Sequence, residues 1–257
     1  DSIHNRLSKH ALPVHLPIGF EKDINGLVDL LDMKAYTYND YTDKALVQGE
    51  IPADMLEKAK NARSLLVEAA VEAEDELFER YLEQGEESIT LEELKRALRK
   101  RVLAGDFFLV TGGDGRGVIV EKVLDLVTDF LPSPLDVDAI QGTNPKTGDV
   151  IERKPADNEP LSALAFKIAS DPFVGRLIFV RVYSGKLTAG SYVLNTTTGE
   201  KERIGRIVRM HADKREDIDF VGAGDIAAVV GLKTTFTGHT LSDPANPIVL
   251  ESIEFPE

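Results

Sequence analysis

Hydrophobic residues recur every three or four positions in two stretches of the first 106 residues, and this spacing predicts two helices. The first begins at Pro52 and ends before Gly85, and the face opposite its apolar stripe is densely acidic. Thr90 and Glu93 begin the second as a capping box, in which each side chain bonds a free backbone amide. The expected buried positions of this second helix are Leu91, Leu94, Leu98 and Val102. Before both helices, Leu16–Gly49 has the composition of short strands and turns.

A strand, a glycine-rich loop and a helix are expected in residues 107–134. Phe107–Val110 is the predicted strand and Val120–Leu131 the predicted amphipathic helix. The residues expected on its apolar side are Val120, Val123, Leu124, Val127 and Leu131. A single strand–loop–helix unit cannot bury its own apolar faces, so it is expected to be part of a larger sheet. The two prolines of Leu131–Pro134 cannot continue the helix and mark the clearest domain boundary.

Strand patterns follow one another from Leu135 to Phe255 with no helical pattern between them. Within Ser162–Ser170, for example, large apolar residues alternate with smaller or polar ones. Turn sequences such as Thr198-Gly199 separate the strands. Short strands at this spacing predict a closed antiparallel barrel of about 120 residues.

Charge is distributed unevenly along the chain. The formal charge of −14 argues against a protein that wraps nucleic acid with a generally basic surface. Glu21–Asp106 carries a net −9, whereas Arg181–Met210 carries a net +4. A barrel with basic residues on one face can follow the phosphates of folded RNA, and a solvated basic face is the alternative. The candidate RNA-contact residues are Arg181, Lys201, Arg203, Arg206 and Arg209.

The sequence lacks the residues or motifs that several kinds of chemistry require. There is no cysteine, which excludes disulfides and thiolate chemistry and fits a reducing cytoplasm. No phosphate-binding G-x-x-x-x-G-K-[ST] stretch and no guanine-binding N-K-x-D stretch occurs. The histidines are scattered, and the acidic pairs Asp136/Asp138 and Asp217/Asp219 miss the other ligand positions of a calcium loop, so no metal site is expected. No apolar run is long enough to span a membrane.

The run Gly113-x-Gly115-x-Gly117 is the remaining candidate for binding an anion. A glycine-rich loop between a strand and a helix can present backbone amides to a phosphate. The run lacks the full dinucleotide-binding fingerprint, so a plain turn is the alternative.

A series of sequence strings resembles bacterial elongation factor G, in the same order and over essentially the whole chain. Those resembling its second domain are Asp171–Leu177, Arg181–Gly185, Gly190–Asn195, Lys201–Arg206, Met210–Ala212, Ala223–Ile226 and Glu254–Glu257. Those resembling its GTPase domain with the inserted subdomain are Leu16–Gly19, Ile51–Asp54 and Leu131–Asp136.

The resemblance implies a mixed α+β chain with an incomplete α/β GTPase-domain remnant. Residues 1–15 would belong to that remnant and residues 16–106 to an inserted α+β subdomain with acidic helices. Residues 107–134 would be the last strand, loop and helix of the GTPase domain with its proline linker, and residues 135–257 an antiparallel translation-factor β-barrel. The family's GTP-binding motifs would precede Asp1, so an internal fragment is expected.

The resemblance also implies a role in protein synthesis. The expected function is that of a ribosome-binding fragment of a cytoplasmic GTPase that promotes tRNA–mRNA translocation. The barrel would contact small-subunit ribosomal RNA, the inserted subdomain would contact the stalk protein of the large subunit, and the remaining domains of the factor would pack against this part. The fragment is expected to be monomeric, independent of membranes and without a cofactor of its own, although the intact family uses GTP and Mg²⁺.

One departure from the family concerns the guanine-binding loop. The family has a Ser-Ala dipeptide whose backbone contacts guanine, and Gly113 and Asp114 stand at those positions, followed by Gly115. An aspartate in place of alanine would bring a carboxylate near the edge of the base. Two alternatives to a translocase therefore stay open: a paralogue for ribosome recycling or protection, and a free-standing barrel module that binds RNA or protein without a GTPase parent.

We predict that this chain alone binds neither GTP nor GDP and is catalytically inactive, because the residues that grip phosphate are missing. Titration calorimetry with each nucleotide and Mg²⁺ should show no saturable heat. A dissociation constant in the micromolar range would contradict the prediction.

Overall fold

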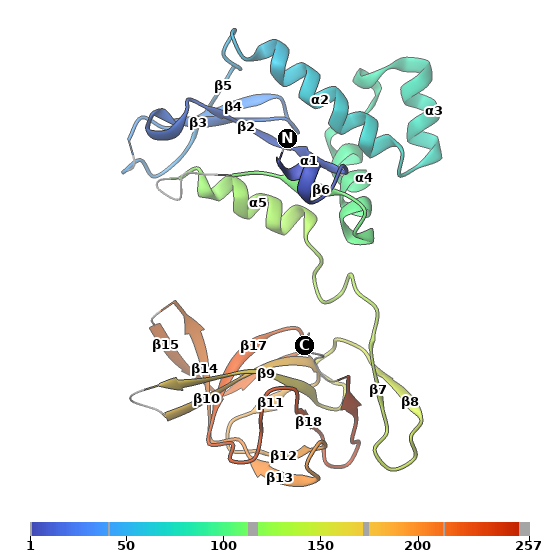
Figure 1. The fold of residues 1–257 in the computed structure, drawn as a ribbon, viewed down its shortest axis with the longest axis vertical. Helices are drawn as coiled ribbons and strands as arrows, with labels where there is room; N and C mark the ends of the chain where they lie inside the picture. Colours follow the sequence, from blue (N-terminus) through green and yellow to red (C-terminus); the bar gives the residue numbers. More distant parts are fainter. Residues whose placement is uncertain (1, 41, 113–117, 172–174, 213, 252–257) are drawn as a thin grey trace. The chain divides into compact units, whose positions relative to one another are not determined.

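The structure is a computed structural model that describes residues 2–40, 42–112, 118–171, 175–212 and 214–251 (Figure 1). It divides into two compact units, Asp1–Pro132 and Ser133–Glu257, and the division falls inside the proline-containing segment Leu131–Pro134. The described helices all lie in the first unit, whereas the second consists of antiparallel strands. The predicted mixed α+β class is confirmed.

The first unit combines a parallel strand pair, an antiparallel sheet and helices. β1 pairs in parallel with β6, although almost the whole unit separates them in sequence. β2, β3, β4 and β5 form a four-stranded antiparallel sheet in chain order. The strands of this unit are β1 (Ala11–Pro13), β2 (His15–Ile18), β3 (Gly26–Asp29), β4 (Lys34–Thr37), β5 (Val47–Gly49) and β6 (Phe108–Val110). Its α-helices are α1 (Ser2–Arg6), α2 (Leu56–Val71), α3 (Asp75–Gln84), α4 (Leu91–Ala104) and α5 (Val120–Phe130).

The single helix predicted between Pro52 and Gly85 is wrong, because the chain breaks it into α2 and α3. α2 ends at Val71, and α3 begins at Asp75 with two acidic residues in its first turn, where the positive end of the helix dipole favours them. The break lets Leu66 of α2 and Leu77 of α3 enter the same core. A continuous helix would carry the second half of this apolar stripe straight on, away from that core.

The capping box predicted at the start of α4 is confirmed. The Glu93 amide donates to the Thr90 hydroxyl (3.3 Å), and the Thr90 amide donates to the Glu93 carboxylate (3.0 Å). Arg80 of α3 lies 2.6 Å from the other Glu93 oxygen. The hydrogen bond from Arg80, followed by those from Thr90, lowers the pKa of Glu93 to about 2. This carboxylate therefore joins the cap of α4 to α3.

The buried faces of α4 and α5 differ in part from the prediction. Leu94 and Leu98 are buried as expected, but Leu91 is exposed. In α5 the prediction is wrong, because Leu126 and Phe130 face the core while Leu124, Val127 and Leu131 are exposed. The helix has apolar residues on more than one side, so the spacing alone does not identify the side that the rest of this unit covers.

The second unit is built from short strands. Eight of them form one sheet in the order β13-β12-β18-β9-β10-β17-β14-β15, and β19, β7 and β8 form a smaller sheet. The strands are β7 (Ile140–Thr143), β8 (Val150–Arg153), β9 (Ser162–Asp171), β10 (Gly175–Ser184), β11 (Leu187–Thr188), β12 (Tyr192–Asn195), β13 (Glu200–Arg203), β14 (Arg206–His211), β15 (Lys214–Ile218), β16 (Phe220–Val221), β17 (Ile226–Val230), β18 (Thr240–Ser242) and β19 (Val249–Leu250).

The large sheet closes on itself through Ile204 and Gly205. These residues carry the chain from β13, at one end of the strand order, to β14 near the other end. The Ile204 amide donates to the Ser191 carbonyl (2.9 Å), and the Gly205 amide donates to the Val230 carbonyl (3.1 Å). A methyl group on Gly205 would lie 2.5 Å from that carbonyl oxygen, so only glycine permits the approach. The predicted barrel is confirmed.

Alternation along β10 separates the inside of the barrel from its outside. Val180 and Val182 are fully buried in the barrel core, whereas Phe179, Arg181 and Tyr183 are half-buried on the outer side. Tyr183 packs there in a small apolar cluster with residues of β7, β8 and β19. The smaller sheet therefore covers part of the outer surface of the barrel.

We predict that Glu93→Gln destabilises the first unit by about 1 kcal/mol at neutral pH, because the cap loses its charge-assisted bond to Arg80. The pKa of Glu93 is lowered on folding, so its contribution is present above the ordinary value near 4.3 and is lost as pH falls toward about 2. Thermal unfolding followed by the helical circular-dichroism signal reports this unit. Glu92→Gln, an exposed neighbour in the same first turn, is the control. Equal effects of both changes at all pH values would contradict the prediction.

Candidate functional site

The predicted RNA-contact residues lie on three strands of the barrel. Lys201 and Arg203 are exposed on β13, and Arg206 and Arg209 are exposed on β14. Arg181 lies on β10 and is half-buried. β13 and β14 follow each other across the junction Ile204–Gly205, where the sheet closes, whereas β10 lies in the middle of the strand order.

The exposed arginines of this set have weak partners. An Arg206 guanidinium nitrogen lies 3.9 Å from an Asp217 oxygen, and an Arg209 nitrogen lies 3.8 Å from an Asp225 oxygen. Arg203 donates to the Gly190 carbonyl at 3.4 Å. Exposed pairs of this kind contribute about 0–1 kcal/mol, so a phosphate can replace the carboxylate at small cost. Arg203, Arg206 and Arg209 are thus exposed cations with weak partners, and we call these three residues the arginine face.

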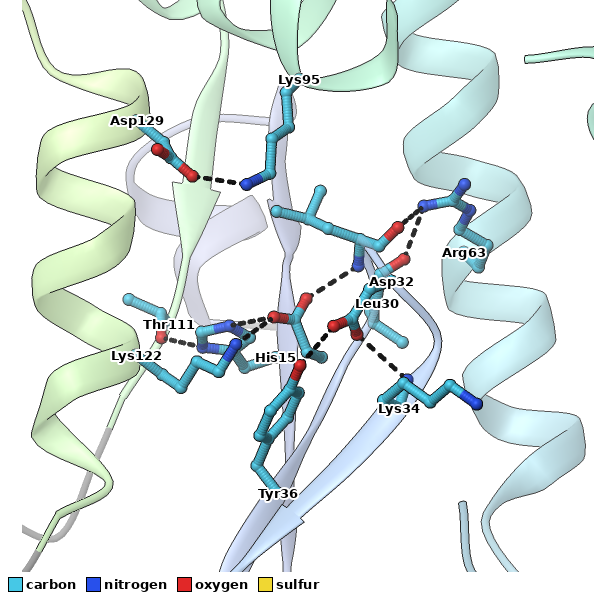
Figure 2. Close-up of polar contacts among 12 residues, drawn as sticks. His15, Leu30, Asp32, Lys34, Tyr36, Arg63, Lys95, Thr111, Lys122 and Asp129 are labelled. Atoms are coloured by element: carbon cyan, nitrogen blue, oxygen red, sulfur yellow. Dashed lines mark hydrogen bonds and ion pairs between the residues drawn. The ribbon is translucent and has the colours of Figure 1, made fainter. Parts of the chain in front are cut away.

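The predicted nucleotide-contact residues Gly113, Asp114 and Gly115 lie outside the described residues. Thr111, just before them, is described, and it takes part in a polar network inside the first unit (Figure 2). The Thr111 hydroxyl and His15 Nδ1 are 2.8 Å apart. His15 Nε2 lies 3.7 Å from the Asp29 carboxylate, and Lys122 Nζ lies 3.3 Å from the same oxygen. The network thus joins the segment after β6 to β2, β3 and α5.

Asp29 is the centre of this network. Its side chain is 9% exposed, and besides His15 and Lys122 it accepts a hydrogen bond from the Leu31 amide (2.9 Å). Burial raises the pKa of Asp29, but the nearby His15 ring, the hydrogen bond from the Leu31 amide and the charge of Lys122 outweigh burial and lower it. Burial likewise lowers the pKa of Lys122, and Asp29 together with Tyr36 raises it by more. The Asp29–Lys122 pair is therefore ionised at neutral pH.

A second layer of contacts surrounds this pair. Lys122 Nζ lies 3.6 Å from the centre of the Tyr36 ring, and the Tyr36 hydroxyl donates to Asp32 (2.5 Å). Arg63 of α2 donates to the carbonyls of Leu30 (2.8 Å) and Leu31 (2.6 Å), as Figure 2 shows for Leu30. Burial first, then the hydrogen bond to Asp32, raises the pKa of the Tyr36 hydroxyl. The turn that follows Asp29 is thereby bound by Arg63 through its carbonyls and by Tyr36 through Asp32.

Thr111, His15 and Asp29 stand in the order of a hydroxyl nucleophile, a base and a carboxylate. Their environment does not suit catalysis: the His15 side chain is 3% exposed, and the cavity that Thr111 lines is otherwise formed by apolar residues such as Phe108 and Leu126. The network positions the end of β6 instead. Sequence reasoning missed it, although an aspartate inside the apolar run Leu27–Leu31 is a signal that could have indicated a buried charge.

Neither a metal site nor a membrane-spanning helix is found in the described residues. No group of three or more His, Cys, Asp or Glu side chains in this part of the chain is placed to hold a metal ion. No helix in the same part combines the length and apolar character needed to cross a membrane.

Comparison with known proteins gives one match within the barrel and one over the whole chain. Residues 175–242 match the family model described as elongation factor Tu domain 2. The whole chain matches the crystal structure of the protein ttk003000868 from Thermus thermophilus, with 25% sequence identity and a TM-score of 0.75. The match covers 100% of this chain and 35% of the Thermus protein, so the chain spans about a third of that protein's length. Together the two matches support a relation to the translational GTPases.

We predict that Lys122→Met destabilises the first unit by about 2 kcal/mol or more, because it leaves the buried Asp29 carboxylate without its cation. Lys34→Met is the control, since Lys34 pairs with a Glu50 side chain that is 90% exposed and should change stability by less than about 0.5 kcal/mol. Denaturant unfolding of both variants checks this. The pKa of Asp29 is lowered on folding, so the difference should shrink as pH falls below about 4. Similar losses in the two variants would contradict the prediction.

Proposed function

We propose that the chain is the ribosome-binding part of an elongation-factor-G-like translational GTPase that promotes tRNA–mRNA translocation. In this proposal the barrel contacts small-subunit ribosomal RNA and the helical part of the first unit contacts the large-subunit stalk protein. GTP and Mg²⁺ are bound by residues of the factor outside these 257, and the chain acts in the cytoplasm.

The observation that carries the proposal is the combination of two parts in one chain. The barrel matches elongation factor Tu domain 2 over residues 175–242. The unit before it, with its parallel strand pair, lies within the match to the Thermus protein, which covers 100% of this chain. A barrel that acts alone would not need this first unit, so the free-standing module is the weaker alternative.

The exposed apolar side of the first unit supports a GTPase-domain remnant. Phe108 of β6 is 50% exposed, and Leu124 and Val127 of α5 are 59% and 47% exposed. Parallel sheets are normally covered on both faces, and two parallel strands rarely stand alone. Further strands of a nucleotide-binding sheet, packed on this side, would bury these residues.

The arginine face supports contact with RNA. Arg203, Arg206 and Arg209 are exposed, and the carboxylates near Arg206 and Arg209 lie 3.8–3.9 Å away in water-accessible positions. Phosphate oxygens offer the guanidinium group two acceptors in the geometry of its donors. A paralogue for ribosome recycling or protection would use the same face, so the assignment to translocation rests on the resemblance to elongation factor G.

We predict that reversing Arg203, Arg206 and Arg209 to Glu weakens binding to purified ribosomes at least about tenfold. Co-sedimentation over a range of salt concentrations should show a shallower dependence of log Kd on log salt, by roughly one unit for each phosphate that the variant no longer binds. The fold should survive, since the ion pairs that the variant removes are exposed.

The matched control reverses Lys146, Lys154 and Lys233, which are exposed in the same unit and change the net charge equally. Equal loss in both triple variants would show a general charge effect and remove the arginine face from the proposal. Failure of the unaltered chain to bind ribosomes would overturn the proposed function itself.

A further inference from the structure

A cavity of about 220 Å³ lies on the outer side of the barrel, beneath the β7–β8 hairpin. Its lining includes Ile140 of β7, Arg153 of β8, and Arg181 and Tyr183 of β10. Pro134 and Gly224 complete one wall. All of these residues belong to the second unit, so the cavity is formed within it.

The strand pattern directs both arginines toward this cavity. On β8 Ile151 and Arg153 are half-buried, whereas Val150 and Glu152 are exposed. On β10 Arg181 alternates with buried Val180 and Val182. The Arg181 guanidinium carbon lies 5.1 Å from the centre of the Tyr183 ring, so the two side chains lie together on the outer side of the barrel.

Both guanidinium groups retain donors without an acceptor. Arg153 donates to the carbonyls of Glu152 (3.0 Å) and Asn246 (3.3 Å), but its Nε is buried and has no partner among the described residues. The Arg181 Nε is also buried without a partner there, and no ion pair or hydrogen bond of this side chain is found in the described part of the chain. Buried donors of this kind normally have an acceptor. Two of them line one small cavity, and an oxyanion is an acceptor that suits both.

The charge and the walls of the cavity favour one kind of anion. Asp138 is the only acidic residue of the lining among the described residues, so the two arginines leave a net charge of +1. This matches a monoanion such as a carboxylate, whose two oxygens fit the planar donor fork of arginine. The remaining lining is largely apolar, with Val137, Ile140 and Pro155. The volume equals that of roughly seven water molecules, which suits a small ligand.

The wall beside Pro134 is preformed. The Gly224 amide donates to the Val182 carbonyl (2.7 Å), which ties this turn to β10 next to Arg181. Gly224 has a φ of +90°, and a Cβ there would lie 2.4 Å from Pro134 Cγ. Glycine therefore allows the linker to approach the barrel and shape the cavity.

We propose that this cavity binds a carboxylate on a small apolar body, such as the C-terminal residue of a peptide. The carboxylate lies between Arg153 and Arg181, and the apolar side chain packs against Pro134 and Ile140. This site is separate from the arginine face, and the proposal does not depend on ribosome binding.

The test uses N-acetyl-L-valine as the probe and follows the Nε–H signals of Arg153 and Arg181 in ¹⁵N-labelled full chain. These signals should shift to saturation with N-acetyl-L-valine and stay unchanged with N-acetyl-L-valinamide, which lacks the charge. Arg181→Gln should weaken binding about tenfold or more, and the remaining amide signals report whether that variant is folded.

A second pair of variants tests the shape of the cavity. Gly224→Ala should weaken binding because the new methyl group displaces Pro134, whereas Gly238→Ala should not. Gly238 has a similar φ of +89° with no atom within 4 Å of a Cβ, so it controls for backbone strain alone. If Gly224→Ala unfolds the unit, the Arg181→Gln titration still decides.

Three results would overturn the proposal. The first is no saturable shift of either Nε–H signal with N-acetyl-L-valine. The second is unchanged affinity in folded Arg181→Gln. The third is tighter binding of inorganic phosphate than of N-acetyl-L-valine, which would assign the cavity to phosphate compounds instead.

Discussion

The parallel pairing of β1 with β6 is the constraint on which the first unit depends. It sets Ala11 beside Phe108, so the chain segment between these two strands must begin and end at neighbouring positions. The bond between His15 and Thr111 continues the pairing through side chains just beyond the paired residues. Asp29 then joins this point to the antiparallel sheet, and Lys122 joins it to α5. The buried charge of Asp29 holds these elements together. Removing one of its partners would leave the remaining charge buried without compensation, which destabilises the unit.

Two groups of partly or fully buried charges, one in each unit, differ in how far they are paired. In the first, the Asp29 carboxylate has a histidine, a lysine and a backbone amide around it, although His15 Nε2 itself is buried without a hydrogen-bond partner among the described residues. In the second, the Nε atoms of Arg153 and Arg181 are buried beside a cavity and have no acceptor among the described residues. The physical difference is that a satisfied group stabilises the fold it belongs to, whereas an unsatisfied one stabilises a complex with something else. The two arginines differ from the unpaired donors of the first unit in that both line one cavity.

Local signals predict the structure correctly where they act over a few residues. The capping box at Thr90 and Glu93 needs only the first turn of α4, and the barrel strands need only alternation and turns. The break between α2 and α3 and the buried face of α5 depend on what packs against those helices, which the spacing of apolar residues does not reveal. Asp29 and Lys122 are 93 residues apart, so no local pattern could pair them.

Arg181 shows why the site was harder to predict than the fold. Sequence proximity grouped it with Arg203, Arg206 and Arg209 as one basic stretch, yet β10 holds it half-buried over Tyr183 while the others are exposed. Its partner in the cavity, Arg153, comes from a hairpin that precedes the barrel strands and lies outside that stretch. Basic residues of similar sequence context thus fall into an exposed and an enclosed class. The class depends on the direction in which the strand points the side chain and on whether the smaller sheet covers it. In our proposals the exposed class attracts a polyanion over a distance that salt screens, whereas the enclosed class selects a ligand by shape and by buried donors.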